Sequence, residues 1–399
     1  MIGRSLLSTH AAPSASACPL LEKGFRPFFL AGAAFAVIAV PLWLVALKGG
    51  LQPGGAFGAL QWHAHEMLFG FSTAIVAGFL LTAISNWCGR ETVTGWPLGL
   101  LAGLWLLGRA AMFFASSLPR LVPLLLDASF LPVLTIACAA PLFSTGSRRN
   151  YGFVGLLLGL TIANGAAHVF ALRGDLEAVR VAHRFALNVL VLMLVIMTGR
   201  VVPMFTRNAT RQAWIRTSPL FERLSLTSVA LLSLSELLPG ADRVSGGLSA
   251  VAAVLLLVRM RFWGTSHVFR QPLLWILHVG TLFIPLGLAL RALATSWPSV
   301  PLSSALHALT AGAIGSLTLG MMARVSLGHT GRPLEPARSA QWAFSCVVCA
   351  AGVRISAPFL PSLWYLDALS VAALLWSSAF ALFLFGYFRI LVSARADAR

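Results

Sequence analysis

The chain has 399 residues, of which 58% are hydrophobic and only 10% are charged. Soluble domains carry about 25% charged residues, so this composition excludes an ordinary soluble protein and indicates a polytopic membrane protein. The net charge of +17 does not indicate nucleic-acid binding, because the arginines stand singly between apolar runs. The five cysteines follow no disulfide pattern.

Apolar stretches of about 20 residues, the length that crosses a bilayer as a helix, occur twelve times along the chain. The sequence therefore predicts an all-α polytopic membrane protein. The whole chain, residues 1–399, is expected to be one integral membrane domain, with residues 1–22 as a flexible cytoplasmic tail. The predicted helices lie at about 27–47, 64–86, 97–117, 121–143, 152–172, 182–203, 223–239, 245–261, 271–292, 303–326, 340–358 and 364–391.

The distribution of Lys and Arg predicts the orientation. If the N-terminus is cytoplasmic, twenty of the 29 basic residues fall on the cytoplasmic side and nine on the outer side. Short cytoplasmic loops are enriched in Lys and Arg, so both termini are expected to be cytoplasmic. The segment Gln61–Gly70, which holds two histidines and a glutamate, would then lie at the outer side.

Three of the predicted helices begin with an outer histidine: His65, His183 and His307. Arg200 and Arg324 each follow their histidine by 17 residues. We therefore predict three parallel four-helix repeats around a pseudo-threefold axis, at about residues 1–147, 148–267 and 268–399. The alternative is that positive-inside selection and polar interface residues together produce the apparent period.

Aspartates support the repeat, because Asp127, Asp242 and Asp367 lie 62, 59 and 60 residues after these histidines. The repeat would bring imidazoles and carboxylates to one depth, which is the chemistry of metal sites where an acid orients a ligating histidine. Glu66, beside His65, could orient a ligand in the same way or carry a proton. Haem iron in a bilayer also takes axial histidines.

We expect His65 and His307 to be the axial ligands of haem or copper. His63 lies about 200° from His65 around an ideal helix, so both can bind one metal only if His63 lies in the entering loop. His168 and His183 are further metal candidates at the outer side.

Two of the candidate histidines have a competing interpretation. His183 is followed by Arg184, so it could contact lipid headgroups. His278 stands alone on an apolar helix, where it is either a packed histidine bonded to a neighbouring helix or a functional metal ligand.

Three segments rich in arginine are expected to meet at the cytoplasmic side. They could form a pocket for an anion or for haem propionates, because arginine pairs bidentately with carboxylates. Positive-inside selection alone also explains most of these residues. The candidates are Arg90, Arg200, Arg207, Asn208, Arg324, His329 and Arg332.

Four motifs together resemble the NnrS family: Phe25–Phe29, Trp62–Gly70, Gly199–Asn208 and Arg324–Arg332. The resemblance implies a bacterial inner-membrane protein that contains haem, expected to be b-type, and copper. It also implies a link to denitrification and nitric oxide stress, with nitric oxide or its iron adducts as the small-molecule ligand. Catalysis, binding and sensing remain open, and so does the electron donor.

Two other functions fit the same residues. A transporter of a small anion or metal would line its path with histidines and arginines. A maturation factor for denitrification enzymes would handle haem or copper and bind metal weakly and exchangeably.

Overall fold

The computed structural model describes residues 18–397, and the predicted tail lies largely outside this range. The described residues form helices and no strand, so the all-α polytopic fold is confirmed. The helices are α1 (Phe25–Leu47), α2 (Gly58–His65), α3 (Thr73–Cys88), α4 (Gly95–Phe113), α5 (Leu121–Ala128), α6 (Phe130–Ser144), α7 (Gly152–Leu172), α8 (Leu176–Thr210), α9 (Pro219–Ser235), α10 (Asp242–Met260), α11 (Pro272–Ser296), α12 (Leu302–His307), α13 (Gly315–Gly328), α14 (Arg338–Ser356) and α15 (Ser362–Val392).

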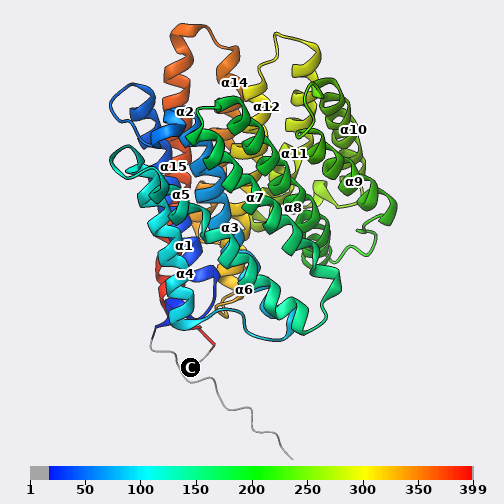
Figure 1. The fold of residues 1–399 in the computed structure, drawn as a ribbon. Coiled ribbons are helices and arrows are strands. Elements are labelled where there is room, and N and C mark those ends of the chain that lie inside the picture. The colour runs from blue at the N-terminus through cyan, green and yellow to red at the C-terminus, as the bar shows by residue number, and fades with distance from the viewer. Residues whose placement is uncertain (1–17, 398–399) are drawn as a thin grey trace, which may run out of the picture.

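Within residues 18–397, eleven helical segments are long and apolar enough to span a membrane. The segments α2–α3, α5–α6 and α12–α13 each count as one span. Helix α9 has 17 residues, or about 26 Å of helix, which is slightly less than a hydrocarbon core of roughly 30 Å. Both ends of the described chain lie at the same end of the bundle (Figure 1), which requires an even number of crossings, so α9 supplies the twelfth.

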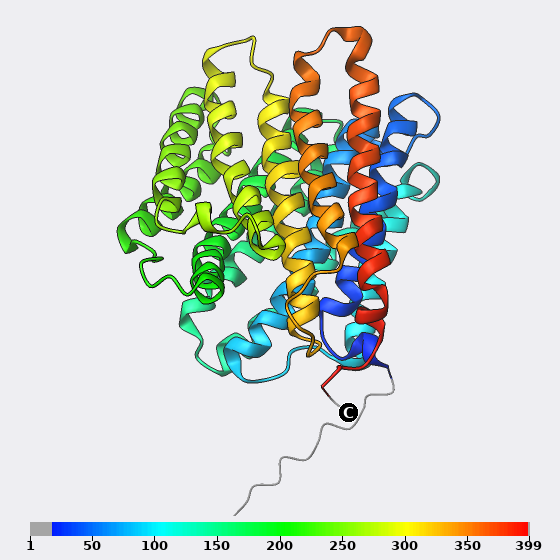
Figure 2. The ribbon, with the colours of Figure 1, turned by 180° about the vertical axis from the view of Figure 1, so that it is seen from behind.

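The first and last helices pack together and close the bundle, as Figure 2 shows from behind. The buried guanidinium of Arg26 donates hydrogen bonds to the carbonyls of Leu391 and Ser393 at the end of α15. These carbonyls have no partner within the helix, so the arginine satisfies them. The start of the Phe25–Phe29 motif therefore has a structural role.

The helices predicted to carry outer histidines lie deepest in the bundle. In an apolar 18-residue window of each span, the share of buried residues is 78% for Gly55–Cys88, 72% for Leu302–Gly328 and 61% for Leu176–Thr210. For most other spans this share is 33–44%. The span Pro272–Ser296 is also 61% buried, although the predicted symmetry gives it no central place. The threefold repeat therefore stays a prediction.

Two of the central helices contain a π-helical segment directly after their histidine. Glu66–Ser72 follows His65, and Ala308–Ile314 follows His307. A π turn adds a residue and rotates the side chains beyond it, and such turns are frequent at functional sites. Each segment contains a tightly packed glycine: an added Cβ would lie 2.9 Å from Phe35 at Gly70 and 2.5 Å from Phe283 at Gly312.

Candidate functional site

The histidines predicted to lie at the outer side fall into two groups on opposite faces of α2. His63 and His65 both lie within this helix and not in the loop before it. Two residues along a helix turn the side chain by about 200°, so the two imidazoles cannot bind one metal. His63 lines a cavity, whereas His65 lies in a buried polar network.

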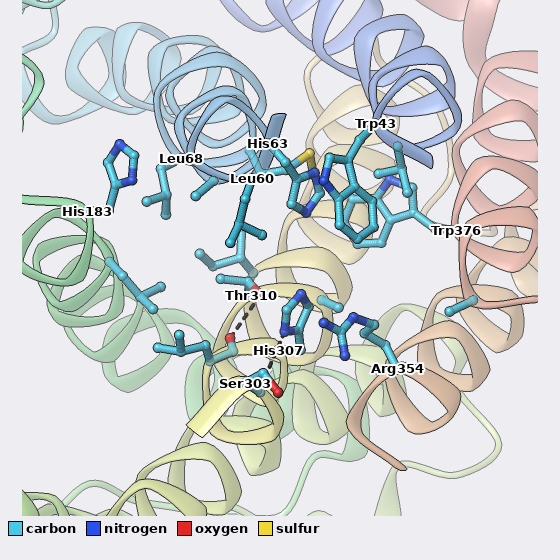
Figure 3. Close-up of a pocket in the computed structure, with 18 of the residues that line it drawn as sticks. Trp43, Leu60, His63, Leu68, His183, Ser303, His307, Thr310, Arg354 and Trp376 are labelled. Carbon is cyan, nitrogen blue, oxygen red and sulfur yellow. Dashed lines mark hydrogen bonds between the residues drawn. The ribbon is translucent and has the colours of Figure 1, made fainter. Parts of the chain in front are cut away.

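A cavity of about 490 Å³ lies between α1, α2, α8, α12, α14 and α15, and we call it the histidine cavity. Its walls are mainly apolar and include Leu68, Trp376 and several leucines and alanines. Its polar side chains include those of His63, His183, His307 and Arg354 (Figure 3). The size and the few convergent polar groups are those of a cofactor or ligand pocket.

The Nε2 atom of His307 has a lone pair available for a ligand in the histidine cavity. Its Nδ1 lies 2.7 Å from the carbonyl oxygen of Ser303, one turn earlier in the helix. A carbonyl can only accept, so Nδ1 carries the hydrogen and Nε2 of the neutral ring has the free lone pair. A backbone carbonyl that fixes the tautomer in this way is typical of metal-ligating histidines.

His63 enters the same cavity from α2. Its ring stacks on the indole of Trp43, with centroids 4.2 Å apart and planes at 24°. Among the described residues, no hydrogen bond engages either of its ring nitrogens. In Figure 3 the rings of His63 and His307 both point into the cavity from facing helices.

Arg354 brings an uncompensated positive charge to this cavity. Its guanidinium lies beside His307 in Figure 3, and Tyr365 lines the same cavity. The Nε and Nη1 atoms are buried and have no hydrogen-bond partner among the described residues. Buried guanidinium nitrogens without a partner are costly, so this side chain is suited to bind an anionic ligand.

His183 lies between the two groups. Its Nδ1 is 3.2 Å from Oε1 of Gln61, and its buried Nε2 has no partner within the described chain. Its ring stacks on Phe57 and lies 5.9 Å from the ring of His65. The neighbouring Arg184 forms an ion pair with Glu236 at 3.0 Å, so the guanidinium of Arg184 contacts a carboxylate of the protein.

The second group is a buried polar network that joins four helices. Arg109 on α4 donates to Glu66 at 2.7 Å and also contacts Asp127 on α5. Asp127 Oδ2 accepts from Asn164 at 2.9 Å and from His168 at 2.8 Å. We call His65, Glu66, Arg109, Asp127, Asn164 and His168 the buried polar network.

Local features of the sequence bring these groups together. Asn164 and His168 are four residues apart, so they share one face of α7. Gly108 lets α4 approach α5 closely, because an added Cβ would lie only 3.1 Å from the Cα of Asp127. The helix predicted at 121–143 breaks at Ser129, directly after Asp127 has turned inward.

Both ring nitrogens of His65 face oxygen atoms. Nδ1 lies 3.2 Å from Glu66 Oε1, and Nε2 lies 2.9 Å from Asn164 Oδ1. The carboxylate oxygen of Glu66 and the amide oxygen of Asn164 both act as acceptors. A protonated His65, which has two N–H groups, can therefore donate one hydrogen bond to each. Together with Arg109 it balances the charges of Glu66 and Asp127. Alternatively, a metal ion replaces these hydrogens, because ligand atoms of His65, Asp127 and His168 lie within 4.8 Å of one another.

The other predicted residues lie elsewhere. His278 is a packed histidine, with Nε2 2.9 Å from Thr206 Oγ1 and Nδ1 3.0 Å from Thr265 Oγ1. Asp242 and Asp367 are exposed, and no interaction joins either to a described histidine. Their expected orienting role is therefore not supported, because each lies in the first turns of a peripheral helix.

The residues predicted to meet at the cytoplasmic side do not form one pocket. Arg200 and Arg207 line a second cavity of about 490 Å³ together with Arg149 and Arg216, which we call the arginine cavity. The other predicted members lie apart from it in separate local contacts. Arg90 donates to Ser144, Arg324 stacks on Phe205, Arg332 donates to the Thr330 carbonyl, His329 packs near Phe25, and Asn208 is exposed.

Sequence reasoning missed Arg109 and Arg354 as site residues, because it counted both as topology signals. Each follows a long apolar run, and an ionisable residue at such a position is expected to be functional and to have a partner. That rule, applied to arginines as well as to histidines, would have found them. No simple signal identifies Trp43 or Gln61, whose roles depend on contacts with distant helices.

Comparison with known proteins adds the family. A family model described as NnrS protein matches residues 19–395, which is nearly the whole chain. A comparison with the curated proteins finds no match. The matched range includes α2 and α12, the buried polar network and the two cavities. The chain therefore belongs to the NnrS family.

Proposed function

We propose that this protein binds haem in the histidine cavity and acts in nitric oxide resistance or nitric oxide metabolism at the bacterial inner membrane. Membership of the NnrS family supports the link to nitric oxide. In this proposal both termini are cytoplasmic, so the histidine cavity lies in the outer half of the bilayer. Bound haem would supply an iron atom that can ligate nitric oxide or its adducts.

One observation carries the proposal: two histidines with available nitrogens and an unpartnered arginine meet in one apolar cavity. Haem has an apolar ring, axial positions for imidazoles and anionic propionates, so it matches all three features. His63 and His307 would hold the iron, and Arg354 would bind a propionate. In this assignment His63 takes the place that the sequence argument gave to His65.

Copper is proposed for a different site, the group of His65, Asp127 and His168. Imidazole and carboxylate are suitable ligands for copper, and the three residues are buried. Arg109 opposes a cation there, because its guanidinium contacts Asp127. Glu66 reduces this repulsion because it accepts a hydrogen bond from Arg109 at 2.7 Å.

A transport function has one observation in its favour. Helix α8 lines both cavities, with Leu187 in the histidine cavity and Ile196 in the arginine cavity. Nine residues of helix span about 14 Å, so a small anion would have a short distance to travel between them. A maturation role for haem or copper would use the same sites with weaker binding.

The test is an absorption spectrum and metal analysis of the purified protein, before and after addition of nitric oxide. We expect a Soret band that shifts with nitric oxide and that is lost in His63→Ala and His307→Ala. His278→Ala is the matched control, because this buried histidine is bonded on both ring nitrogens. The proposal would be wrong if the purified protein had no Soret band, or if the band were unchanged in both His63→Ala and His307→Ala. Anion uptake into vesicles at a rate independent of haem would favour transport.

A further inference from the structure

The arginine cavity is a second candidate site, at the opposite end of α8 from His183. Its charged lining side chains are Arg149, Arg200, Arg207, Arg216 and Glu222. We propose that it binds an anion that carries a phosphate group. The site is independent of the haem proposal, since none of these residues lines the histidine cavity.

The charge of this cavity is not neutralised by the described residues. Glu222 is its single acidic side chain, and its Oε1 accepts from Arg259 at 2.7 Å. Arg259 itself does not line the cavity, so this ion pair leaves four guanidinium groups without a carboxylate partner. Like charges gathered in one concave site repel each other and attract an anion.

Arg200 is held in place for such a ligand by neutral groups. It donates to Asn150 Oδ1 at 2.8 Å and to the carbonyl of Arg149 at 3.3 Å. Its guanidinium carbon also lies 5.5 Å from the ring centre of Phe153 and 6.0 Å from that of Trp87. These contacts fix the side chain without removing its charge, so less entropy is lost when a ligand binds.

Phosphate is the anion that best matches several converging guanidinium groups. Its oxygens accept paired hydrogen bonds, and arginine forms bidentate contacts with them. The remaining walls include Phe153, Ile196, Met204 and Leu226, which are apolar and can contact the glycerol or acyl part of a lipid. The phosphate can therefore belong to an anionic phospholipid headgroup or be free inorganic phosphate.

The test measures the apparent melting temperature of the full-length protein in neutral detergent and phosphate-free buffer at constant ionic strength. Three additives are titrated: short-chain phosphatidylglycerol, short-chain phosphatidylcholine and inorganic phosphate. We expect phosphatidylglycerol, inorganic phosphate or both to raise the melting temperature by a few degrees, and phosphatidylcholine to have little effect. A response to phosphatidylglycerol alone identifies a lipid site, and a response to inorganic phosphate identifies a site for the free anion.

The variants link the effect to the cavity. Arg200→Gln combined with Arg207→Gln should weaken the apparent affinity by about tenfold or more. Arg148→Gln is the matched control, because Arg148 is exposed beside Arg149 but does not line the cavity. If the double variant does not fold, Arg207→Gln and Arg216→Gln are measured singly, since both side chains are exposed. No response to either anion, an equal response to phosphatidylcholine, or full affinity in the cavity variants would overturn the proposal.

Discussion

Arg109 and Arg354 lie near the ends of α4 and α14, two helices that pack on the π segments, but only Arg109 meets carboxylates. Glu66, directly after His65, accepts from Arg109 at 2.7 Å. The residue directly after His307 is Ala308, which offers no carboxylate. The charge of Arg109 is therefore neutralised by carboxylates of the protein, whereas the charge of Arg354 remains available to a ligand.

The first prediction concerns Arg354. Arg354→Gln should weaken the affinity for haem by about tenfold or more and so lower its occupancy when haem is limiting, because a charge-assisted contact to a propionate is worth roughly 1.5–3 kcal/mol. The melting temperature of the haem-free protein should change little, since no carboxylate among the described residues pairs with this side chain. The ratio of Soret to protein absorbance measures occupancy, and Arg338→Gln, at the exposed start of α14, is the control. Unchanged occupancy would contradict the assignment of Arg354.

The second prediction concerns Arg109. Arg109→Gln should destabilise the protein by about 3–5 kcal/mol, because it leaves the buried carboxylates of Glu66 and Asp127 with too little positive charge. The combination with Glu66→Gln should recover part of this loss, since it removes one of the stranded charges. Denaturation curves of the two single variants and the double variant measure the coupling. Strict additivity would show that the ion pair has no energetic role.

Helix periodicity predicted from the sequence that His63 and His65 cannot share a metal within a helix, and the structure agrees. It could not predict which of them shares a cavity with His307. That choice depends on how α2 and α12 are rotated relative to each other, which follows from packing between segments some 240 residues apart. The sequence pattern favoured His65, whereas both nitrogens of His65 are engaged by Glu66 and Asn164.

Eleven of the twelve predicted spans could be found because hydrophobic length alone identifies them. The largest difference in bounds is at 182–203, where α8 runs from Leu176 to Thr210 and, at 35 residues or about 52 Å, is longer than a hydrocarbon core of roughly 30 Å. Of the three aspartates predicted to lie near a histidine, only Asp127 contacts one among the described residues, with Oδ2 3.2 Å from His65 Nε2. Asp127 lies where the helix breaks and turns inward, and this break carries no strong sequence signal.

The third prediction separates copper from haem. His168→Gln should lower copper bound per protein several-fold and leave the Soret band unchanged, because His168 belongs to the buried polar network and not to the histidine cavity. His278→Gln should retain the copper. Elemental analysis and the absorption spectrum of the same sample give both readouts. Copper retained in His168→Gln would exclude this residue as a ligand.

The last prediction tests the π segment after His307. Gly312→Ala should destabilise the protein by about 1–3 kcal/mol, because the added Cβ would lie 2.5 Å from Phe283 and must push the two helices apart. Gly352→Ala is the matched control in α14, where an added Cβ meets nothing within 4 Å, so stability should stay equal or rise by up to about 1 kcal/mol. Since Gly312 lies five residues after His307, the shift should also weaken haem binding, measured as loss of the Soret band on dilution. Stability lost without any change in haem affinity would separate the packing role of the π segment from the position of His307.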